Sequence, residues 1–226
     1  MVGRIWVARP GTARYNDAIQ TGSTDAAHSR PGKEEYIMRV VKKPEERKAE
    51  MVAAASRLFA QQGFVRTSVA EIVSAVDVAK GLFYYYFTTK DDMVKAVVEG
   101  YCSYLGAQTQ QIADLPIPAR EKISRLMQLD TWQQCFTQPM LADLCLPQHA
   151  ALYSDMCDRL YTHMGPALES IARQALSERG KDTQDAGRMT GVAVYGILMM
   201  ARRGEMTLQS ACEMFLRILG CNADVA

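Results

Sequence analysis

The chain of 226 residues is 48% hydrophobic and 23% charged, which is typical of a folded globular protein and excludes a disordered or fibrous one. Its formal net charge of +1 excludes a chain that attracts its partners through a strong overall charge.

Charge is spread unevenly along the chain. Residues 38–101 hold ten Lys and Arg against eight Asp and Glu, whereas residues 102–226 hold eleven against thirteen. The mild positive balance favours an anionic partner for the first of these segments.

Cysteine spacing and apolar runs indicate the compartment. The six cysteines form no CxxC pair, so free thiols in a reducing environment are expected. The longest apolar run, 192–201, is too short to span a bilayer, and the N-terminus has no continuous apolar signal-peptide core. We expect a cytoplasmic protein with no membrane partner.

The first 37 residues differ from the rest. Residues 1–37 mix Gly, Thr, Ser, Pro and Arg with few large apolar residues and no period, which predicts a disordered tail. A second hypothesis is that translation begins at Met38 and that this segment is a mis-assigned start. The intact mass of the native protein distinguishes the two.

Two helices are expected next. Pro44 suits a first helical turn, apolar residues recur at helical spacing over 52–59, and Gly63 supplies a stop. A second helix follows, because Ser68 and Glu71 fit the S-x-x-E capping box.

A third helix is expected from Ala79, after a short turn at Asp77 and Val78, and it contains five consecutive aromatic residues, 83–87. One helix face cannot bury all five. At about 100° per residue, the arc predicted to be buried holds Leu82, Phe83, Tyr86 and Phe87. The arc left outside holds Lys80, Gly81, Tyr84 and Tyr85.

That outer arc carries a cation, two phenol hydroxyls and a residue without a side chain. Such a face suits a groove lined by phosphates, because the cation and hydroxyls donate to phosphate oxygens and glycine permits close backbone approach. A helix packed on both sides is the alternative.

The rest of the chain is also predicted to be helical. A fourth helix begins after Thr89, with Asp91 and Asp92 in its first turn. Beyond a break at 115–118, no stretch alternates as a strand does, so the expected fold is all-α. Further helices are expected at 119–136, 139–146, 148–179, 183–202 and 207–219.

The segment from about Lys43 to Val98 resembles the DNA-binding domain of the TetR family of bacterial transcriptional regulators. The resemblance is carried by RLFAQQGF, TSVAEIVSAVDVAKGLFYYYF and TTKDDMV. It implies an N-terminal three-helix helix-turn-helix DNA-binding domain, assigned here to residues 38–90. A helical ligand-binding and dimerisation domain would occupy residues 91–226.

The resemblance also implies roles for the residues that match the family pattern. Ser68, with Thr67 beside it, matches a position that contacts phosphate. Lys80 and Gly81 match recognition positions near base edges.

Tyr84 and Tyr86 match two ring positions that reach the DNA backbone, and Lys90 matches the family's phosphate-binding lysine. Tyr85 has no fixed role in the family, but the helical wheel places it outside. The predicted DNA-binding residues are therefore Thr67, Ser68, Lys80, Gly81, Tyr84, Tyr85, Tyr86 and Lys90.

The chain departs from the family pattern in the turn before the third helix. Asp77 stands where the family usually has glycine, and Asp tolerates the left-handed conformation better than most residues. The third helix is also poor in Arg, Asn and Gln, the usual readers of base edges. Specificity would then depend on Lys80, on backbone approach at Gly81 and on DNA shape.

Aromatic and methionine side chains gather between residues 132 and 164, a composition that suits an adaptable apolar pocket. The effector would be a small, partly apolar molecule of unknown identity, and an ordinary helical core is the alternative. The candidate ligand-binding residues are Trp132, Cys135, Phe136, Met140, Tyr153, Met156, Tyr161 and Met164.

The last two predicted helices are apolar over wide arcs, and Gly187, Gly191 and Gly196 would permit close helix approach. In the family such a pair forms a four-helix interface, which implies a homodimer. A dimer also doubles the short footprint of one recognition helix on DNA. An intramolecular core is the alternative.

The expected function is that of a ligand-responsive, sequence-specific transcriptional regulator. We expect a repressor that a small molecule releases from a palindromic operator. An activator or a co-ligand-dependent regulator of the same fold is the alternative, and an architectural DNA-binding protein needs no such second domain.

Enzyme, metal and redox interpretations are weaker. The chain has three histidines and no Gly-rich phosphate loop, so we expect neither an enzyme nor a cofactor. Cys145 and His149 are four residues apart, but Pro147 interrupts them, and no metal site is expected. A redox-sensing cysteine lacks the basic neighbour that would activate it.

Overall fold

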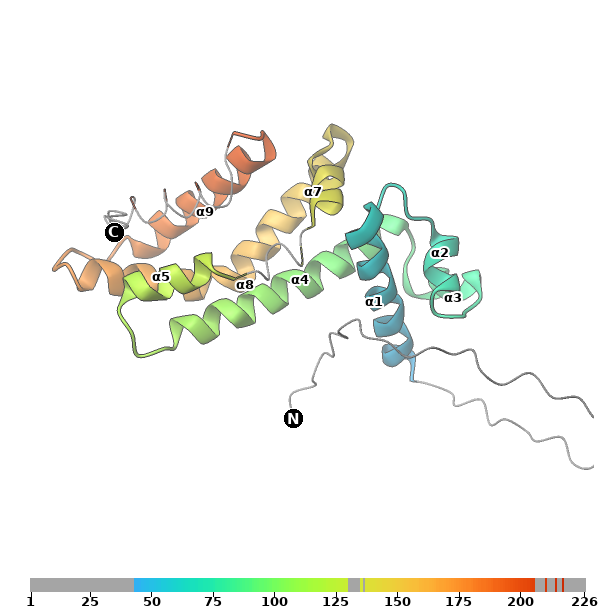
Figure 1. The fold of residues 1–226 in the computed structure, drawn as a ribbon, viewed down its shortest axis with the longest axis horizontal. Coiled ribbons are helices and arrows are strands. Elements are labelled where there is room, and N and C mark those ends of the chain that lie inside the picture. Colours follow the sequence, from blue (N-terminus) through green and yellow to red (C-terminus); the bar gives the residue numbers. More distant parts are fainter. Residues whose placement is uncertain are drawn as a thin grey trace, which may run out of the picture. The chain divides into compact units, whose positions relative to one another are not determined.

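The computed structural model describes residues 43–129, 135, 137–205, 210, 214 and 217. All described residues lie in one compact unit, residues 42–226. They form helices and no strand, as the all-α prediction requires (Figure 1). The predicted tail, Met38, Trp132, Phe136 and most of segment 207–219 lie outside the described residues.

Three helices open the described unit: α1 (Pro44–Gln62), α2 (Val69–Ser74) and α3 (Lys80–Tyr86). α1 ends where expected, because Gly63 adopts φ +80°, a conformation that favours glycine. Both α1 and α3 contact α2, which gives a helix-turn-helix arrangement.

Long helices form the remainder. α4 (Lys90–Ala113) packs along α8 (Ala150–Ser177), and α9 (Ala186–Arg202) packs against α8 (Figure 1). The shorter α5 (Ala119–Met127) contacts both α4 and α8. A polar cluster joins the two longest helices, because Glu99 of α4 bonds to Arg159 and to His163 Nε2 of α8, the latter at 2.8 Å.

α7 (Gln138–Cys145) and the 3₁₀ turn η1 (Pro147–His149) connect the two parts of the unit. α7 contacts α1 on one side and α8 on the other. α4 also contacts α1, so both α4 and α7 link the helix-turn-helix to the C-terminal helices.

The prediction of one helix over 119–136 is wrong at its C-terminal part. α5 ends at Met127, and Leu129 lies outside any helix. The N–H of Gln128 is shared among the carbonyls of residues 124–126, which tightens the last turn and ends the helix. No Gly or Pro marks this end in the sequence, which is why the apolar pattern suggested a longer helix.

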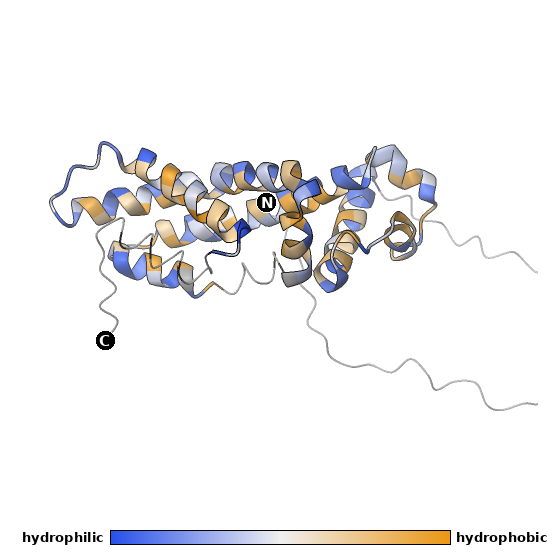
Figure 2. Cartoon of the chain, turned by 90° about the horizontal axis from the view of Figure 1, so that it is seen from above, coloured by the Kyte–Doolittle hydropathy of each residue, from blue (hydrophilic) through white to orange (hydrophobic). Residues whose placement is uncertain are grey.

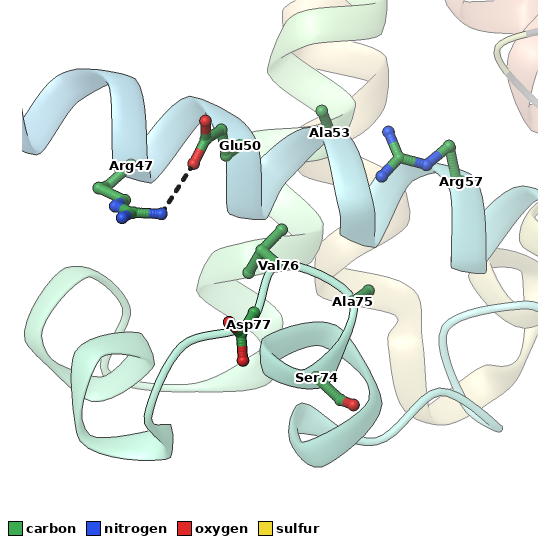
Figure 3. A pocket seen from close by; sticks show the side chains of 8 residues that line it. All are labelled: Arg47, Glu50, Ala53, Arg57, Ser74, Ala75, Val76 and Asp77. Carbon is green, nitrogen blue, oxygen red and sulfur yellow. Dashed lines mark hydrogen bonds and ion pairs between the residues drawn. The ribbon is translucent and has the colours of Figure 1, made fainter. Parts of the chain in front are cut away.

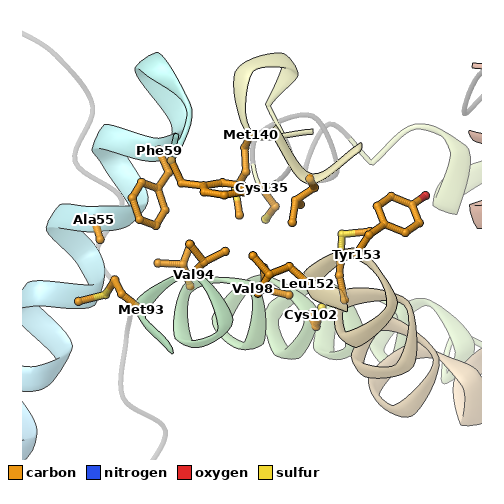
Figure 4. Close-up of a cluster of buried hydrophobic side chains, with 14 of the residues drawn as sticks. Ala55, Phe59, Met93, Val94, Val98, Cys102, Cys135, Met140, Leu152 and Tyr153 are labelled. Carbon is orange, nitrogen blue, oxygen red and sulfur yellow. The ribbon is translucent and has the colours of Figure 1, made fainter. Parts of the chain in front are cut away.

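One hydrophobic core runs through both parts of the unit. Ala55 and Phe59 of α1 meet Val94 and Val98 of α4, and the same cluster continues to Tyr153 of α8 (Figure 4). Hydrophilic and hydrophobic residues alternate along the helices (Figure 2), as expected for amphipathic helices that each bury one face. The boundary predicted near residue 90 therefore lies within a continuous core.

None of the described helices combines the length with the apolar character that a membrane span needs.

Candidate functional site

The start of α2 is built as the sequence predicts. Ser68 is the N-cap: its Oγ accepts the N–H of Glu71 at 3.2 Å, and Glu71 Oε2 accepts the N–H of Ser68 at 2.7 Å. The bond from the Ser68 N–H is the main cause of the lowered pKa of Glu71, which keeps this carboxylate charged. The capping box thus fixes an exposed serine at the N-terminus of α2.

Thr67 does not share the exposure of Ser68. Its side chain is only 1% exposed, and its hydroxyl donates to the carbonyl of Gly63 at 2.7 Å. Gln62 Nε2 in turn donates to the Thr67 hydroxyl at 3.3 Å. Thr67 therefore braces the loop between α1 and α2 with the hydroxyl that the family resemblance placed near phosphate.

The burial of α3 agrees with the helical wheel. Phe83 and Phe87 lie in the core, and Tyr86 is half-buried with Leu82. Tyr84 and Tyr85 are 51% and 74% exposed. The predicted division of the aromatic run into buried and outward residues is confirmed.

The outward face of α3 also carries the predicted cation, Lys80, and the residue without a side chain, Gly81. Lys80 Nζ lies 6.0 Å from the centroid of the Tyr84 ring, a cation–π distance. A Cβ built at Gly81 meets nothing within 4 Å, so the backbone here is open to close approach. This exposed set of Lys80, Gly81, Tyr84 and Tyr85 can meet a surface that offers both anionic oxygens and flat bases.

Asp77 has φ +50°, in the left-handed region expected for the glycine-like position in the turn before α3. The neighbouring amides of Asp77 and Val78 donate to the carbonyls of Ser74 and Val73, which closes the turn. Aspartate is accommodated without loss of the helix-turn-helix geometry.

The ammonium group of Lys90 is already hydrogen-bonded to other parts of the protein. Its Nζ donates to the carbonyls of Phe64, Val65 and Thr67 at 2.9, 3.3 and 3.2 Å. A lysine ammonium has three N–H donors, so all of them are directed at the loop between α1 and α2. The role of Lys90 as a phosphate ligand stays a prediction, and it would require one of these contacts to be exchanged.

The sequence reasoning passed over two exposed cations. Arg66 is exposed in the loop directly before the Ser68 cap, and Lys48 of α1 places its Nζ 5.5 Å from the Phe87 ring at the end of α3. The signal for Arg66 was a basic residue two positions before the serine of a capping box. Lys48 could not be found in this way, because only the tertiary fold brings it near the end of α3.

An open hollow of about 410 Å³ lies between α1 and the turn that follows α2 (Figure 3). Its walls are polar: Arg47 pairs with Glu50 at 3.2 Å on one side, and Asp77 lies on the other. The hollow belongs to the flank of the helix-turn-helix. It contains none of the residues predicted to bind an effector.

The predicted effector residues divide into two groups. Cys135, Met140, Tyr153 and Met156 are buried together in the main core, as Figure 4 shows for the first three. Tyr161, by contrast, is half-buried and packs on Tyr195 of α9 at a centroid distance of 5.4 Å. The partly buried Met164 packs against the edge of the core.

Tyr153 is the most polar feature of the buried group. Its hydroxyl donates to the carbonyl of Leu198, and the guanidinium of Arg202 lies 5.1 Å from the ring centroid. Burial is the main cause of its raised pKa. The phenol of Tyr153, on α8, and the guanidinium of Arg202, on α9, thus lie together beside otherwise apolar side chains.

The buried thiols are held in their neutral form. Burial raises the pKa of Cys102 and of Cys157 to about 12 and that of Cys135 to about 11. Such thiols are poor nucleophiles near neutral pH. Among the described residues no three His, Cys, Asp or Glu side chains are grouped to hold a metal, and His149 Nδ1 instead lies 2.7 Å from the Asp143 carbonyl.

α9 presents an apolar face to solvent. Val192, Tyr195 and Met199 are exposed at helical spacing, and a Cβ at Gly196, between them, would meet nothing within 4 Å. Tyr195 is anchored to Asp158 at 2.7 Å, and this bond raises its pKa to about 12.

The other two glycines of α9 serve a different purpose from the one expected. A Cβ at Gly187 would lie 2.8 Å from the Glu169 carboxylate, and one at Gly191 would lie 3.0 Å from the Tyr161 hydroxyl. Both glycines therefore admit α8 of the same chain. Of the three, Gly196 alone faces open space.

Comparison with known proteins identifies relatives of the helix-turn-helix. The family model of bacterial regulatory proteins, tetR family, matches residues 51–97. The repressor KstR2 of Mycolicibacterium smegmatis is 30% identical over 83 residues, 37% of this chain and 40% of KstR2. The regulator HbdR of Aromatoleum is 38% identical over 63 residues, 26% of this chain and 28% of HbdR. The matched part spans less than half the length of each relative.

Solved structures extend the likeness to most of the chain. RolR in complex with resorcinol has a TM-score of 0.58 and 20% identity, covering 80% of this chain and 89% of RolR. A TetR-family regulator from Mesorhizobium loti has a TM-score of 0.56 and 16% identity, covering 80% of this chain and 95% of its own. At such identities the likeness shows the fold alone.

Proposed function

We propose, on the premise that this chain belongs through its helix-turn-helix to the TetR family of bacterial regulatory proteins, that it is a sequence-specific DNA-binding transcriptional regulator. The outward face of α3 is the observation that carries the proposal. Two exposed tyrosines, an exposed lysine and an open glycine stand on a helix whose phenylalanines are locked in the core.

The roles on α3 follow from exposure. Lys80 donates to base edges in the major groove, and Gly81 lets the backbone approach them. Tyr84 and Tyr85 donate their hydroxyls to phosphates, and Tyr86 reaches a phosphate from its half-buried position at the margin of the core.

Phosphate contacts extend to the loop before α2. Ser68 is exposed at the α2 N-terminus, and Arg66 adds a cation beside it. Lys90 joins the same phosphate-binding edge by exchanging one of its three loop carbonyls for a phosphate oxygen. Thr67 supports this edge from inside, through the loop.

A homodimer reads a palindromic operator. The exposed apolar face of α9, with Val192, Tyr195, Gly196 and Met199, supports an isologous contact through the last two predicted helices. Two copies of α3 then meet half-sites about one helical turn of DNA apart.

The effector is a small, partly apolar molecule, and the protein is a repressor that this molecule releases from DNA. The buried group around Met140 and Tyr153 supports an apolar wall of an effector-binding pocket. RolR, which shares the fold, has been seen in complex with resorcinol. Binding would favour a state in which the two recognition helices are mis-spaced. The protein acts in the cytoplasm without catalysis.

Selection of the purified full chain against randomised duplex DNA tests the function. The winning sequences are then titrated by fluorescence anisotropy at two salt concentrations. A palindrome bound by a dimer, with affinity that falls steeply as salt rises, is expected. No enriched sequence, with only weak binding at low salt, would contradict the proposal.

A further inference from the structure

We propose that Asp143 of α7 is a positioning residue: it clasps the loop between α1 and α2 and transmits movements of α7 to the DNA-binding face. The proposal rests on the function above, and it connects the proposed effector-binding core to the DNA-binding helices.

The clasp begins with a direct bond. Asp143 Oδ2 accepts the backbone N–H of Val65 at 2.8 Å, across 78 positions of the chain. The carboxylate also lies against Gly63, where a Cβ would come within 2.3 Å of Oδ2. Gly63 is thus required twice, by its φ of +80° and by the approach of α7.

Further contacts hold the same loop from α7 and η1. The Phe64 ring lies 4.9 Å from the His149 ring, and His149 Nδ1 is 2.7 Å from the Asp143 carbonyl. Just before the loop, the Thr137 hydroxyl donates to the Ala60 carbonyl at 3.1 Å. Lys90 of α4 also binds three carbonyls of the loop.

The loop leads directly to the proposed phosphate-binding edge. Thr67 ties the loop to Gly63, and the next residue is Ser68, the cap of α2. Arg66 stands on the loop itself. If the clasp opens, the loop, Arg66 and the start of α2 are free to shift relative to α3.

The other end of the link is the core. Met140 lies one helical turn before Asp143 on α7, and it is fully buried with Cys135 and Tyr153 in the main cluster (Figure 4). Met140 and Asp143 lie on the same eight-residue helix. A molecule that displaces Met140 would therefore shift Asp143 as well, provided that α7 stays helical.

The first experiment measures the clasp in the free, full-length protein. Amide exchange of Val65 is followed by NMR in the wild type, Asp143→Ala, Asp143→Asn and Asp182→Ala. Asp182 is the matched control, because its carboxylate also accepts a backbone N–H, from Gln184 at 2.9 Å, in the loop between α8 and α9.

Asp143→Ala is expected to speed Val65 exchange about tenfold, whereas Asp143→Asn keeps an acceptor oxygen and stays near wild type. Asp182→Ala should leave Val65 unchanged. Unchanged exchange in Asp143→Ala would overturn the proposal. Circular dichroism melts of each variant separate local opening from general unfolding.

The second experiment measures positioning, with the duplex selected from random DNA. Asp143→Ala should weaken binding of that duplex about tenfold and of a scrambled duplex much less, with recovery in Asp143→Asn. The wild type should also slow amide exchange across 138–146 when the selected duplex binds, and Asp143→Ala should not. Equal losses on both duplexes, or α7 exchange that ignores DNA, would overturn the proposal.

The two experiments separate this proposal from the function on which it rests. If no sequence is enriched by the wild type, the proposed function fails, and transmission to DNA fails with it. The Val65 exchange still decides whether Asp143 clasps the loop.

Discussion

At the scale of single residues, the predicted DNA-binding side chains differ in whether the protein itself already binds their polar groups. Tyr84, Tyr85 and Lys80 are exposed. Thr67 and Lys90, in contrast, are engaged by the loop between α1 and α2. Motif matching treats these residues alike, because it sees their spacing and not their partners. The consequences of substitution should therefore differ.

Lys80→Ala should weaken binding of the selected operator by about 1–3 kcal/mol and relax its sequence preference, because a contact to a base edge is lost. A competition titration with single-base operator variants measures this. Lys181→Ala, an exposed lysine in the loop before α9, is the control for a simple loss of charge. Equal losses from the two substitutions would remove Lys80 from base recognition.

Lys90→Ala should lower the free energy of unfolding by roughly 1–3 kcal/mol, because three loop carbonyls lose their donor. It should also weaken binding to all duplexes and reduce the salt slope by about one, if the ammonium additionally meets a phosphate. Urea unfolding and salt titration measure the two effects separately. A stability loss with an unchanged slope would assign Lys90 to the loop alone.

At the scale of elements, caps and stops determine where helices begin, and side-chain packing determines what each helix touches. The capping box at Ser68 starts α2 and the cap at Thr89 starts α4, as predicted, and Thr89 also forms a capping box with Asp92. The stop at Gly63 also follows from sequence, but the second reason for this glycine does not. Only the position of α7 reveals that Asp143 fills the space where a side chain would be.

Gly63→Ala should destabilise the protein by roughly 2 kcal/mol or more, because alanine is strained at this φ and its Cβ meets Asp143. Gly180→Ala is the matched control: φ is +64°, but its Cβ would meet nothing within 4 Å, so only the backbone cost of about 1 kcal/mol remains. Urea denaturation compares the two. Equal destabilisation would show that Asp143 moves away from the new Cβ without a loss of stability.

At the scale of the whole molecule, the continuous core joins the DNA-binding helices to the C-terminal helices, while the apolar face of α9 lies outside it. Val192 is 77% exposed, which is unusual for a large apolar side chain on a helix that otherwise packs well. In the proposed dimer, burial by a second copy would remove this face from water.

Val192→Glu should convert the dimer to monomer, because the two-fold axis brings the new charges together. Analytical ultracentrifugation measures the mass, and anisotropy should show operator binding weakened at least about tenfold through loss of the second half-site. Tyr104→Glu, at an exposed position of α4, is the control. A dimer that persists in Val192→Glu would exclude this face.

The sequence by itself determined the helix starts at Ser68 and Thr89, the stop at Gly63 and the division of residues 82–87 into core and surface. Each depends on residues within about four positions, where helix geometry and capping decide the outcome. The tertiary structure alone decided the partners of Lys90 and Asp143 and the intramolecular use of Gly187 and Gly191. These depend on contacts between residues far apart in the chain, which the packing of the helices creates and which no local pattern contains.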